Sequence, residues 1–371
     1  MIDSSRIGRF GFGLMRLPKK DGGIDIEQTK EMVDLFMDAG FNYFDTAWAY
    51  GGSEDAIRQA LVERYPRESF YLATKNAAWI SCKTREEAAA QFETSLERLG
   101  TEYVDFYLLH NLGNKRTKVF EDFDLWDYFG EKKKEGKIKH LGFSFHSTAA
   151  ELEEILDAHP EAEFVQLQIN YADWESESVQ SRRCYEAARK RGIPVIVMEP
   201  VKGGLLATPP EKVREIFRST EPGSSFASWA IRFCADLDGV LTVLSGASST
   251  EQMKDTLSAM RGFSGLSDSQ RKTLAEASEA LSEYPVIPCT SCDYCFKVCP
   301  EDIGISGTFE AMNMVSLYGN RDFALTQMGW SIDAAGRKRA KDCIKCGRCE
   351  KACPQHIEIR KELERCVKEL G

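Results

Sequence analysis

The stretch Phe44-Asp45-Thr46-Ala47-Trp48-Ala49-Tyr50-Gly51 follows an apolar run and places a carboxylate where a β-strand would end. Aspartate is a poor strand residue, so Asp45 at this position indicates an ion pair or a functional site. Tyr50 falls in the loop beyond the strand, where a phenol can donate a proton once its pKa is lowered from about 10. The alternative is a purely structural role, in which the stretch is a capped turn with a packed tyrosine. The rest of the chain must decide between a functional site and this structural turn.

The composition is that of an ordinary globular protein. The chain has 371 residues, a formal charge of −10 and 43% hydrophobic residues, which suits one large and one small domain. The negative net charge argues against general nucleic-acid binding. The N-terminus lacks the apolar run of a signal peptide, and no stretch approaches the length of a membrane span. We therefore expect a cytoplasmic protein with neither a nucleic-acid nor a membrane partner.

Short apolar runs alternate with amphipathic segments as far as about residue 262. Helical patterns include 27–39, 53–65 and 84–99, with N-caps expected at Ser53 and Thr84. The eight runs predicted as strands are 9–14, 42–45, 70–74, 104–109, 139–143, 164–168, 194–198 and 240–244. This alternation predicts an α/β fold with a parallel sheet and right-handed crossovers.

Eight strand–helix units in about 250 residues favour a closed (β/α)8 TIM barrel over an open sheet. An open dinucleotide-binding sheet would carry G-x-G-x-x-G after its first strand, and the sequence around Gly11 and Gly13 lacks the third glycine. In a barrel the carboxyl ends of the strands build the active site. Those ends place Asp45 and Tyr50 on the second strand, Lys75 on the third and His110 on the fourth.

A lysine at a strand end is more often solvated, and a histidine there more often has a structural role. Four such residues on three neighbouring strand ends instead indicate a site. At this point the chain resembles the aldo-keto reductases over roughly residues 6–262. The motifs that carry the resemblance are Phe44-Asp45-Thr46-Ala47 with Tyr50-Gly51, then Thr74-Lys75, then Leu109-His110-Asn111.

The resemblance implies an NAD(P)H-dependent carbonyl reductase or alcohol dehydrogenase. Its general acid would be Tyr50, with Lys75 and Asp45 as ion-paired support and His110 orienting the carbonyl. The chemistry agrees, because hydride transfer to a carbonyl carbon develops negative charge on the oxygen, which Tyr50 can protonate and His110 can hydrogen-bond. We expect Lys75 to lower the pKa of Tyr50, and Asp45 to keep Lys75 charged.

The resemblance also implies contacts to the cofactor, which is NADP(H) or NAD(H). Ser144 and Gln168 would contact the carboxamide, and Met198 would pack on the nicotinamide ring. Lys202 with the following glycines can approach the pyrophosphate, and the segment 246–255 resembles the adenosine-end motif. The full set of candidate contacts is Met15, Asp45, Ser144, Gln168, Met198, Lys202, Gly203, Gly246, Ser248, Gln252 and Asp255.

The sequence departs from the family pattern at three of these places. Phe145 stands where an asparagine usually follows Ser144, and Met198 replaces a ring-stacking residue. Asp255 and Thr256 replace a Glu-Asn pair. These departures leave the choice between NADP and NAD open.

A final amphipathic segment over 265–284 ends at Pro285 and Pro288, which predicts a barrel domain over 1–284 and a second domain over 285–371. Of the 12 cysteines, nine lie in the last 83 residues. A reducing compartment keeps thiols free, so such a cluster indicates metal binding rather than disulfides.

Two copies of C-x2-C-x2-C-x3-C-P occupy residues 289–300 and 343–354, the run by which bacterial ferredoxins bind two [4Fe–4S] clusters. In that run the fourth cysteine binds the other cluster. We therefore assign one cluster to Cys289, Cys292, Cys295 and Cys353, and the second to Cys343, Cys346, Cys349 and Cys299. Zinc is the alternative, although it prefers paired C-x-x-C motifs with four ligands. Helical patterns over 309–318 and 321–328 predict a mostly helical dicluster ferredoxin-like domain.

Basic residues surround the second cysteine run, and they are either a solvated surface or a docking site for an acidic ferredoxin- or flavodoxin-type electron carrier. They are Arg337, Lys338, Arg339, Lys341, Lys345, Arg348 and Lys351.

Three functions remain open for the whole protein. The first is an NAD(P)H-dependent carbonyl reductase whose clusters exchange electrons with a partner, which the residues at the strand ends favour. The second is a ferredoxin-linked reductase that uses a flavin or transfers electrons directly to its substrate. The third is a non-catalytic electron relay.

Overall fold

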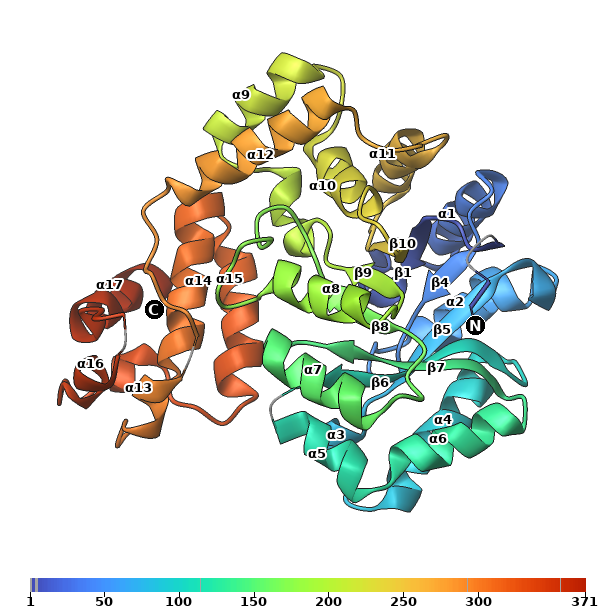
Figure 1. Cartoon of the computed structure of the whole chain (residues 1–371), viewed down its shortest axis with the longest axis horizontal. Helices are drawn as coiled ribbons and strands as arrows, with labels where there is room; N and C mark the ends of the chain where they lie inside the picture. Colours follow the sequence, from blue (N-terminus) through green and yellow to red (C-terminus); the bar gives the residue numbers. More distant parts are fainter. Residues whose placement is uncertain (1, 4–5, 114, 292, 354) are drawn as a thin grey trace. The chain divides into compact units, whose positions relative to one another are not determined.

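The structure is a computed structural model that describes residues 2–3, 6–113, 115–291, 293–353 and 355–371 (Figure 1). Contacts divide the chain into two compact units, Met1–Leu206 with Gly223–Leu274, and Ala207–Pro222 with Ala275–Gly371. Helix α12 (Asp268–Ser282) contributes residues to both units. The domain boundary after residue 284 stays a prediction.

The first unit is built on a closed barrel of eight strands, all parallel, in the order β1-β10-β9-β8-β7-β6-β5-β4, with β4 pairing back to β1 (Figure 1). Each strand corresponds to one of the eight runs predicted from the sequence, so the barrel prediction is confirmed. The strands are β1 (Phe10–Gly13), β4 (Tyr43–Asp45), β5 (Tyr71–Asn76), β6 (Val104–Leu112), β7 (Ile138–Phe145), β8 (Val165–Gln168), β9 (Val195–Met198) and β10 (Val240–Ser245).

Helices follow the strands and cover the outside of the barrel. They are α1 (Ile26–Asp38), α2 (Ser53–Ile57), α3 (Ala78–Ser81), α4 (Arg85–Leu99), α5 (Lys115–Asp122), α6 (Leu125–Lys134), α7 (Ala149–Ala158), α8 (Ser181–Lys190), α10 (Phe226–Ala235) and α11 (Thr250–Met260). A short hairpin, β2 (Lys19–Lys20) with β3 (Gly23–Ile24), was not predicted.

The two expected helix caps have different outcomes. Thr84 caps α4 as predicted, because its Oγ1 accepts a hydrogen bond of 3.3 Å from the backbone N–H of Glu87. The cap at Ser53 is wrong, because Gly52 (φ 75°) occupies the cap position of α2. Ser53 instead donates a hydrogen bond of 2.9 Å to the carbonyl oxygen of Leu14, which ties the start of α2 to the turn after β1.

The barrel interior explains why the strand ends carry the site. Tyr43, Phe106 and Phe164 are fully buried, and their ring centroids lie 5.1 Å apart in successive pairs. Side chains alternate along a strand, so the residue two positions after an inward-facing one also faces inward. The layer above these aromatic rings, toward the carboxyl ends, therefore contains Asp45 and Gln166.

The second unit is mostly helical, as predicted. Its elements are α9 (Glu211–Thr220), α13 (Tyr294–Lys297), α14 (Ile305–Tyr318), α15 (Arg321–Met328), α16 (Arg348–Ala352) and α17 (Ile359–Leu370). Helix α14 packs against both α15 and α17. It begins four residues before the predicted 309, directly after Gly304. Among the described residues of the chain, no helix combines the length and apolarity needed to cross a bilayer.

Candidate active site and cluster sites

The centre of the candidate active site is a buried ion pair between neighbouring strands β4 and β5. Lys75 pairs with Oδ1 of Asp45, and its Nζ also donates a hydrogen bond of 2.7 Å to the carbonyl oxygen of Thr46. The side chains of Lys75 and Asp45 are 0% and 4% exposed. Gln166 on β8 donates a hydrogen bond of 2.9 Å to Oδ2 of Asp45. Removing one partner of such a pair would leave an uncompensated buried charge, which is strongly destabilising.

Tyr50 and His110 lie next to this pair. The Lys75 Nζ is 4.9 Å from the centre of the Tyr50 ring, and the Tyr50 and His110 rings meet edge to face at 5.7 Å. His110 Nδ1 is buried and has no hydrogen-bond partner among the described residues. The structure thus brings together the four residues that the sequence predicted, and leaves a polar ring atom for a ligand to satisfy.

The protonation states follow from burial and from the neighbouring charges. Burial acts to lower the pKa of Lys75, but Asp45 and Tyr50 outweigh it, so the pKa of Lys75 is raised. Burial raises the pKa of Tyr50 above its ordinary value, although Lys75 acts in the opposite direction. Burial, with the Lys75 charge, holds the pKa of His110 well below its usual range. At neutral pH the site therefore contains a protonated phenol and an uncharged imidazole.

This result corrects one expectation. Lys75 does pull down the pKa of Tyr50, but the net shift is upward because burial outweighs the ammonium. The phenol is therefore suited to giving a proton to a carbonyl oxygen, and less suited to standing ready as a tyrosinate.

Among the residues predicted to contact the nicotinamide, Ser144 near the end of β7 is buried, and its Oγ accepts a hydrogen bond of 2.7 Å from the backbone N–H of Asn111. Its own O–H is then available to donate. Gln168 and Met198 end the neighbouring strands β8 and β9 and are half-buried. Met15 lies in the 3-10 turn after β1 and is 52% exposed.

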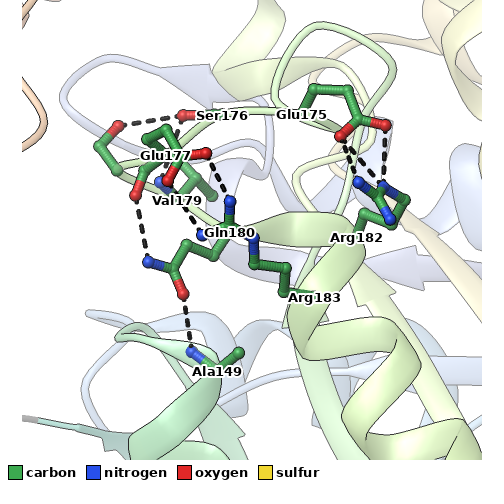
Figure 2. A network of polar contacts seen from close by, with 9 residues as sticks. Ala149, Glu175, Ser176, Glu177, Val179, Gln180, Arg182 and Arg183 are labelled. Carbon is green, nitrogen blue, oxygen red and sulfur yellow. Dashed lines mark hydrogen bonds and ion pairs between the residues drawn. The ribbon is translucent and has the colours of Figure 1, made fainter.

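The loop between β8 and α8 is fixed by a polar network (Figure 2). Gln180 accepts a hydrogen bond of 3.0 Å from the backbone N–H of Ala149 and donates one of 3.2 Å to the carbonyl oxygen of Glu177. Arg182 forms a bidentate pair with Glu175, with Nε donating to Oε1 and Nη2 donating to Oε2, each at 2.8 Å (Figure 2). The loop, together with the ends of β7 and β8, borders an open pocket of about 120 Å³ that His146, Gln168, Ser178 and Val179 help to line.

Lys202, the residue predicted to contact the pyrophosphate, forms an ion pair within the protein. Lys202 Nζ lies 2.6 and 2.7 Å from the two carboxylate oxygens of Asp173, which is itself buried. The following Gly203 and Gly204 have φ of 65° and 101°, values that glycine adopts without strain. The turn can bring backbone close to a ligand, but the Lys202 charge is compensated by Asp173.

The residues expected at the adenosine end support the turn after β10 and the start of α11. Gln252 Oε1 accepts a hydrogen bond of 2.8 Å from the backbone N–H of Ser248, and Asp255 accepts one of 2.6 Å from Ser225. A Cβ added to Gly246 would lie 3.8 Å from the Arg16 guanidinium. These residues stay predictions as cofactor contacts.

Two polar residues of the site were missed from the sequence. Gln166 stands inside an apolar strand with the same alternation as Asp45, and that pattern could have identified it. Arg16 follows β1, and its charge acts to lower the pKa values of Tyr50 and Glu199. No sequence signal pointed to Arg16, because its position depends on the turn between the barrel and the β2–β3 hairpin.

The cysteines of the second unit gather at two pockets. One is lined by Cys289, Cys295 and Cys353, and Cys292 lies outside the described residues. The other is lined by Cys299, Cys343, Cys346 and Cys349. Each pocket thus contains the fourth cysteine of the opposite run, which is the crossing that the sequence predicted.

The pockets fit clusters in their donor set and lining. Ile305 lines both pockets, and each pocket has further apolar lining residues, Ile303 and Leu363 in the second and Phe309 and Ile359 in the first. Within the described part of the chain, no three His, Cys, Asp or Glu side chains converge as ligands of one metal ion. A cubane does not need such convergence, since each thiolate binds a different iron.

Comparison with known proteins agrees with this geometry. The model of the aldo/keto reductase family matches residues 9–279, and the chain belongs to this family. A 4Fe-4S dicluster domain matches residues 288–358, so the chain joins a reductase barrel to an iron–sulfur domain. By family it is an oxidoreductase, as the sequence motifs implied.

Among the relatives is an uncharacterized oxidoreductase of Schizosaccharomyces pombe, which is 26% identical over 68% of this chain and 81% of its own length. An aldo-keto reductase of Mycolicibacterium smegmatis is 30% identical over 38% of this chain, and the match spans only 47% of that relative. The holo form of an aldo-keto reductase from Bacillus halodurans superimposes with a TM-score of 0.57 at 24% identity, covering 72% of this chain and 91% of that one. An aldo-keto reductase from Klebsiella pneumoniae, solved in complex with NADPH, gives 0.56 at 22% identity, covering 73% and 90%. At these identities the solved structures establish the barrel fold alone.

Proposed function

We propose that this protein is an NAD(P)H-dependent carbonyl reductase, or in reverse an alcohol dehydrogenase, whose two [4Fe–4S] clusters exchange single electrons with a partner. The supporting observation is the buried Lys75–Asp45 pair with Tyr50 and His110 around it. A cytoplasmic location, expected from the sequence, is part of the same proposal.

In the reaction, the substrate carbonyl binds between Tyr50 and His110. The Tyr50 phenol transfers its proton to the carbonyl oxygen, and the Lys75 ammonium stabilises the tyrosinate that is left. His110 is uncharged and contributes a hydrogen bond to the same oxygen, as an oxyanion hole does. Asp45 keeps Lys75 charged, and Gln166 keeps Asp45 in place. When bound, NADP(H) or NAD(H) supplies the hydride for the carbonyl carbon.

The cofactor would be held at the carboxyl ends of β7 to β10. Ser144 and Gln168 offer polar groups for the carboxamide, and Met198 offers a soft apolar surface for the ring. The turn 202–204 and the segment 246–255 would take the pyrophosphate and the adenosine end. The neighbouring solved reductase that carries NADPH makes this cofactor the first to test.

The cysteines of the two pockets would hold the clusters in the crossed assignment. When bound, each cluster accepts and releases one electron at a time, which suits exchange with a one-electron carrier. Cys346 and the neighbouring Ile344 are exposed, the latter at 59%, so the second pocket lies close to the protein surface.

A basic hollow of about 370 Å³ adjoins this second pocket and shares Cys343 with it. Lys341, Lys345, Arg360 and Lys368 line it. Lys345 is paired with Glu364 at 2.7 Å, whereas Lys341 and Lys368 have no carboxylate within ion-pair distance among the described residues. The charge of this hollow favours an acidic carrier of the ferredoxin or flavodoxin type, which electrostatic attraction would steer toward it.

Two alternatives from the sequence remain, a ferredoxin-linked reductase with a flavin or direct electron transfer, and a non-catalytic electron relay. The proposal is tested with Tyr50→Phe, which removes the proton donor and keeps the ring. We expect NADPH-dependent carbonyl reduction to fall by about 10²- to 10⁴-fold while NADPH binding, measured by calorimetry, is kept. Full activity of the variant would exclude the proposed reaction, and the absence of nucleotide binding by the wild type would favour the relay.

A further inference from the structure

Arg116 on α5 is a cation beside the candidate active site that the proposed reaction does not use. Its Nε donates a hydrogen bond of 2.7 Å to the carbonyl oxygen of Asn111, the residue after His110. Asn111 has φ of 64°, a left-handed conformation that asparagine tolerates better than most residues. This bend at the end of β6 directs the Asn111 carbonyl oxygen to the guanidinium and fixes Arg116 by one edge.

Trp79 on α3 connects Arg116 to the reacting groups. The Arg116 guanidinium carbon lies 5.8 Å from the centre of the Trp79 ring, and that ring lies 6.5 Å from the His110 ring. Trp79 Nε1 and His110 Nδ1 are both buried without a hydrogen-bond partner among the described residues. Two unsatisfied polar atoms therefore lie on the path between the guanidinium and the carbonyl site.

The charge of Arg116 is not compensated by an ion pair. No described carboxylate lies within ion-pair distance of it, and Glu151 acts on it only through space. The nearby imidazoles do not add charge, since burial lowers the pKa of His110 well below its usual range and that of His146 to about 4. Lys75 is the other cation close to His110, and it is matched by Asp45. The other N–H groups of this half-buried guanidinium have no hydrogen-bond partner among the described residues. Such a group is well suited to a carboxylate, which it can bind with two parallel hydrogen bonds.

We propose that Arg116 binds the carboxylate of the substrate, and that the substrates are carbonyl acids whose apolar or aromatic middle part packs on Trp79. The inference rests on the proposed carbonyl reduction and names the substrate class for that same site. The carbonyl lies at Tyr50 and His110, the flat part of the molecule lies along Trp79, and the carboxylate pairs with Arg116. Arg116 is thus a specificity-determining residue.

The kinetic test uses two aldehydes that differ in charge and hardly in size, 4-carboxybenzaldehyde and 4-formylbenzamide. We expect the wild type to prefer the acid, and Arg116→Gln to lower kcat/KM for the acid by about 10- to 100-fold, as the loss of a charged hydrogen bond does. The amide should change by less than about 3-fold, because a neutral group gains little from the guanidinium. Arg116→Lys keeps the charge and should retain part of the preference. Lys118→Gln, on the same helix but exposed and paired with Asp122, is the matched control and should change neither value.

A binding measurement separates this inference from the proposed reaction. Terephthalate, titrated calorimetrically without turnover, should bind the wild type and the Lys118→Gln protein alike, and at least 10-fold more weakly to Arg116→Gln. If neither aldehyde is reduced, the proposed reaction fails while the titration still decides on Arg116. Equal terephthalate binding by wild type and Arg116→Gln, or an unchanged ratio of acid to amide in that variant, would overturn the inference.

Discussion

Gln166 donates a hydrogen bond of 2.9 Å to Oδ2 of Asp45, although the two residues are 121 positions apart in the chain. Both side chains are buried, and the other carboxylate oxygen of Asp45 pairs with Lys75. Gln166 therefore acts on the Tyr50 site through Asp45 and is a positioning residue. The contact crosses the barrel interior from β8 to β4, so the closure of the barrel and the geometry of the site depend on one another.

Replacing Gln166 by leucine should loosen this arrangement. The Asp45 oxygen would lose its donor, and we expect the free energy of unfolding to fall by about 1–3 kcal/mol. Misplacement of Lys75 should lower kcat for carbonyl reduction by about 10- to 100-fold with little change in NADPH binding. Urea denaturation and steady-state kinetics measure both effects. Gln59→Leu, at an exposed position, is the control, and a Gln166→Leu protein with unchanged kcat would contradict the positioning role.

The pH dependence of carbonyl reduction should follow the Tyr50 phenol. Burial raises its pKa above the ordinary value of 10.0 despite Lys75. Reduction needs the protonated form, so kcat/KM should stay level from neutral pH to beyond about pH 10 and fall only as the phenol ionises.

Lys75→Met should move that alkaline fall to still higher pH. The substitution removes the charge that opposes burial, while Asp45 continues to raise the pKa of Tyr50. The rate on the plateau should also drop, because the tyrosinate left after proton transfer loses its stabilising cation. A shift of the fall to lower pH in this variant would mean that another group controls the profile.

The crossed cluster assignment predicts which cysteine variants resemble each other. Cys353→Ser should lose the same cluster as Cys289→Ser, because Cys353 lines the pocket of Cys289 and Cys295. Cys299→Ser should likewise match Cys343→Ser. Each variant should keep about half of the iron, since each pocket would hold one of two equal clusters. Iron analysis and electron paramagnetic resonance of the reduced proteins measure this. A Cys353→Ser spectrum that matches Cys343→Ser would reverse the assignment.

The basic hollow beside Cys343 should determine the rate of electron exchange with an acidic carrier. Lys341→Gln combined with Lys368→Gln removes the two lysines of the hollow that have no ion-pair partner in the described part of the chain. The second-order rate with reduced flavodoxin should then fall by about 10-fold or more at low salt. The difference should shrink at about 0.3 M salt, where surface charges are screened. Stopped-flow spectroscopy measures both rates. The control is Lys361→Gln. Lys361 lies on α17, as Lys368 does, but it is exposed and pairs with Glu358, so its substitution should have little effect. Equal rates for all three proteins at low salt would exclude the hollow as the docking site.

Much of the fold and of the site could be read from local patterns. The barrel follows from eight repeats of one strand–helix unit, and each repeat carries its own period of hydrophobic residues. Tyr50 could be predicted as a candidate site residue because it lies five positions beyond Asp45 at a predicted strand end. The crossed cysteine assignment could be predicted because the spacing within each run is a local property, which in the bacterial-ferredoxin run indicates both the cluster and its fourth ligand.

Other features depend on contacts between distant segments. The Lys202 charge is compensated by Asp173 from another loop, which the glycines around Lys202 did not suggest. Ser53 was expected to be an N-cap, yet its hydroxyl donates a hydrogen bond to Leu14 in the turn after β1. The partnership of Arg116 with Asn111 needs the left-handed bend at the end of β6.

By itself, the sequence determined the barrel, the iron–sulfur domain and the residue types at the strand ends, because periodicity, turn chemistry and ligand spacing act over a few residues. Only the tertiary structure decided the pKa shifts, the protonation states and the hydrogen-bond partners of those residues. The net rise in the pKa of Tyr50, the neutral state of His110 and the hold of Gln166 on Asp45 all come from desolvation and from partners that closure of the barrel brings together.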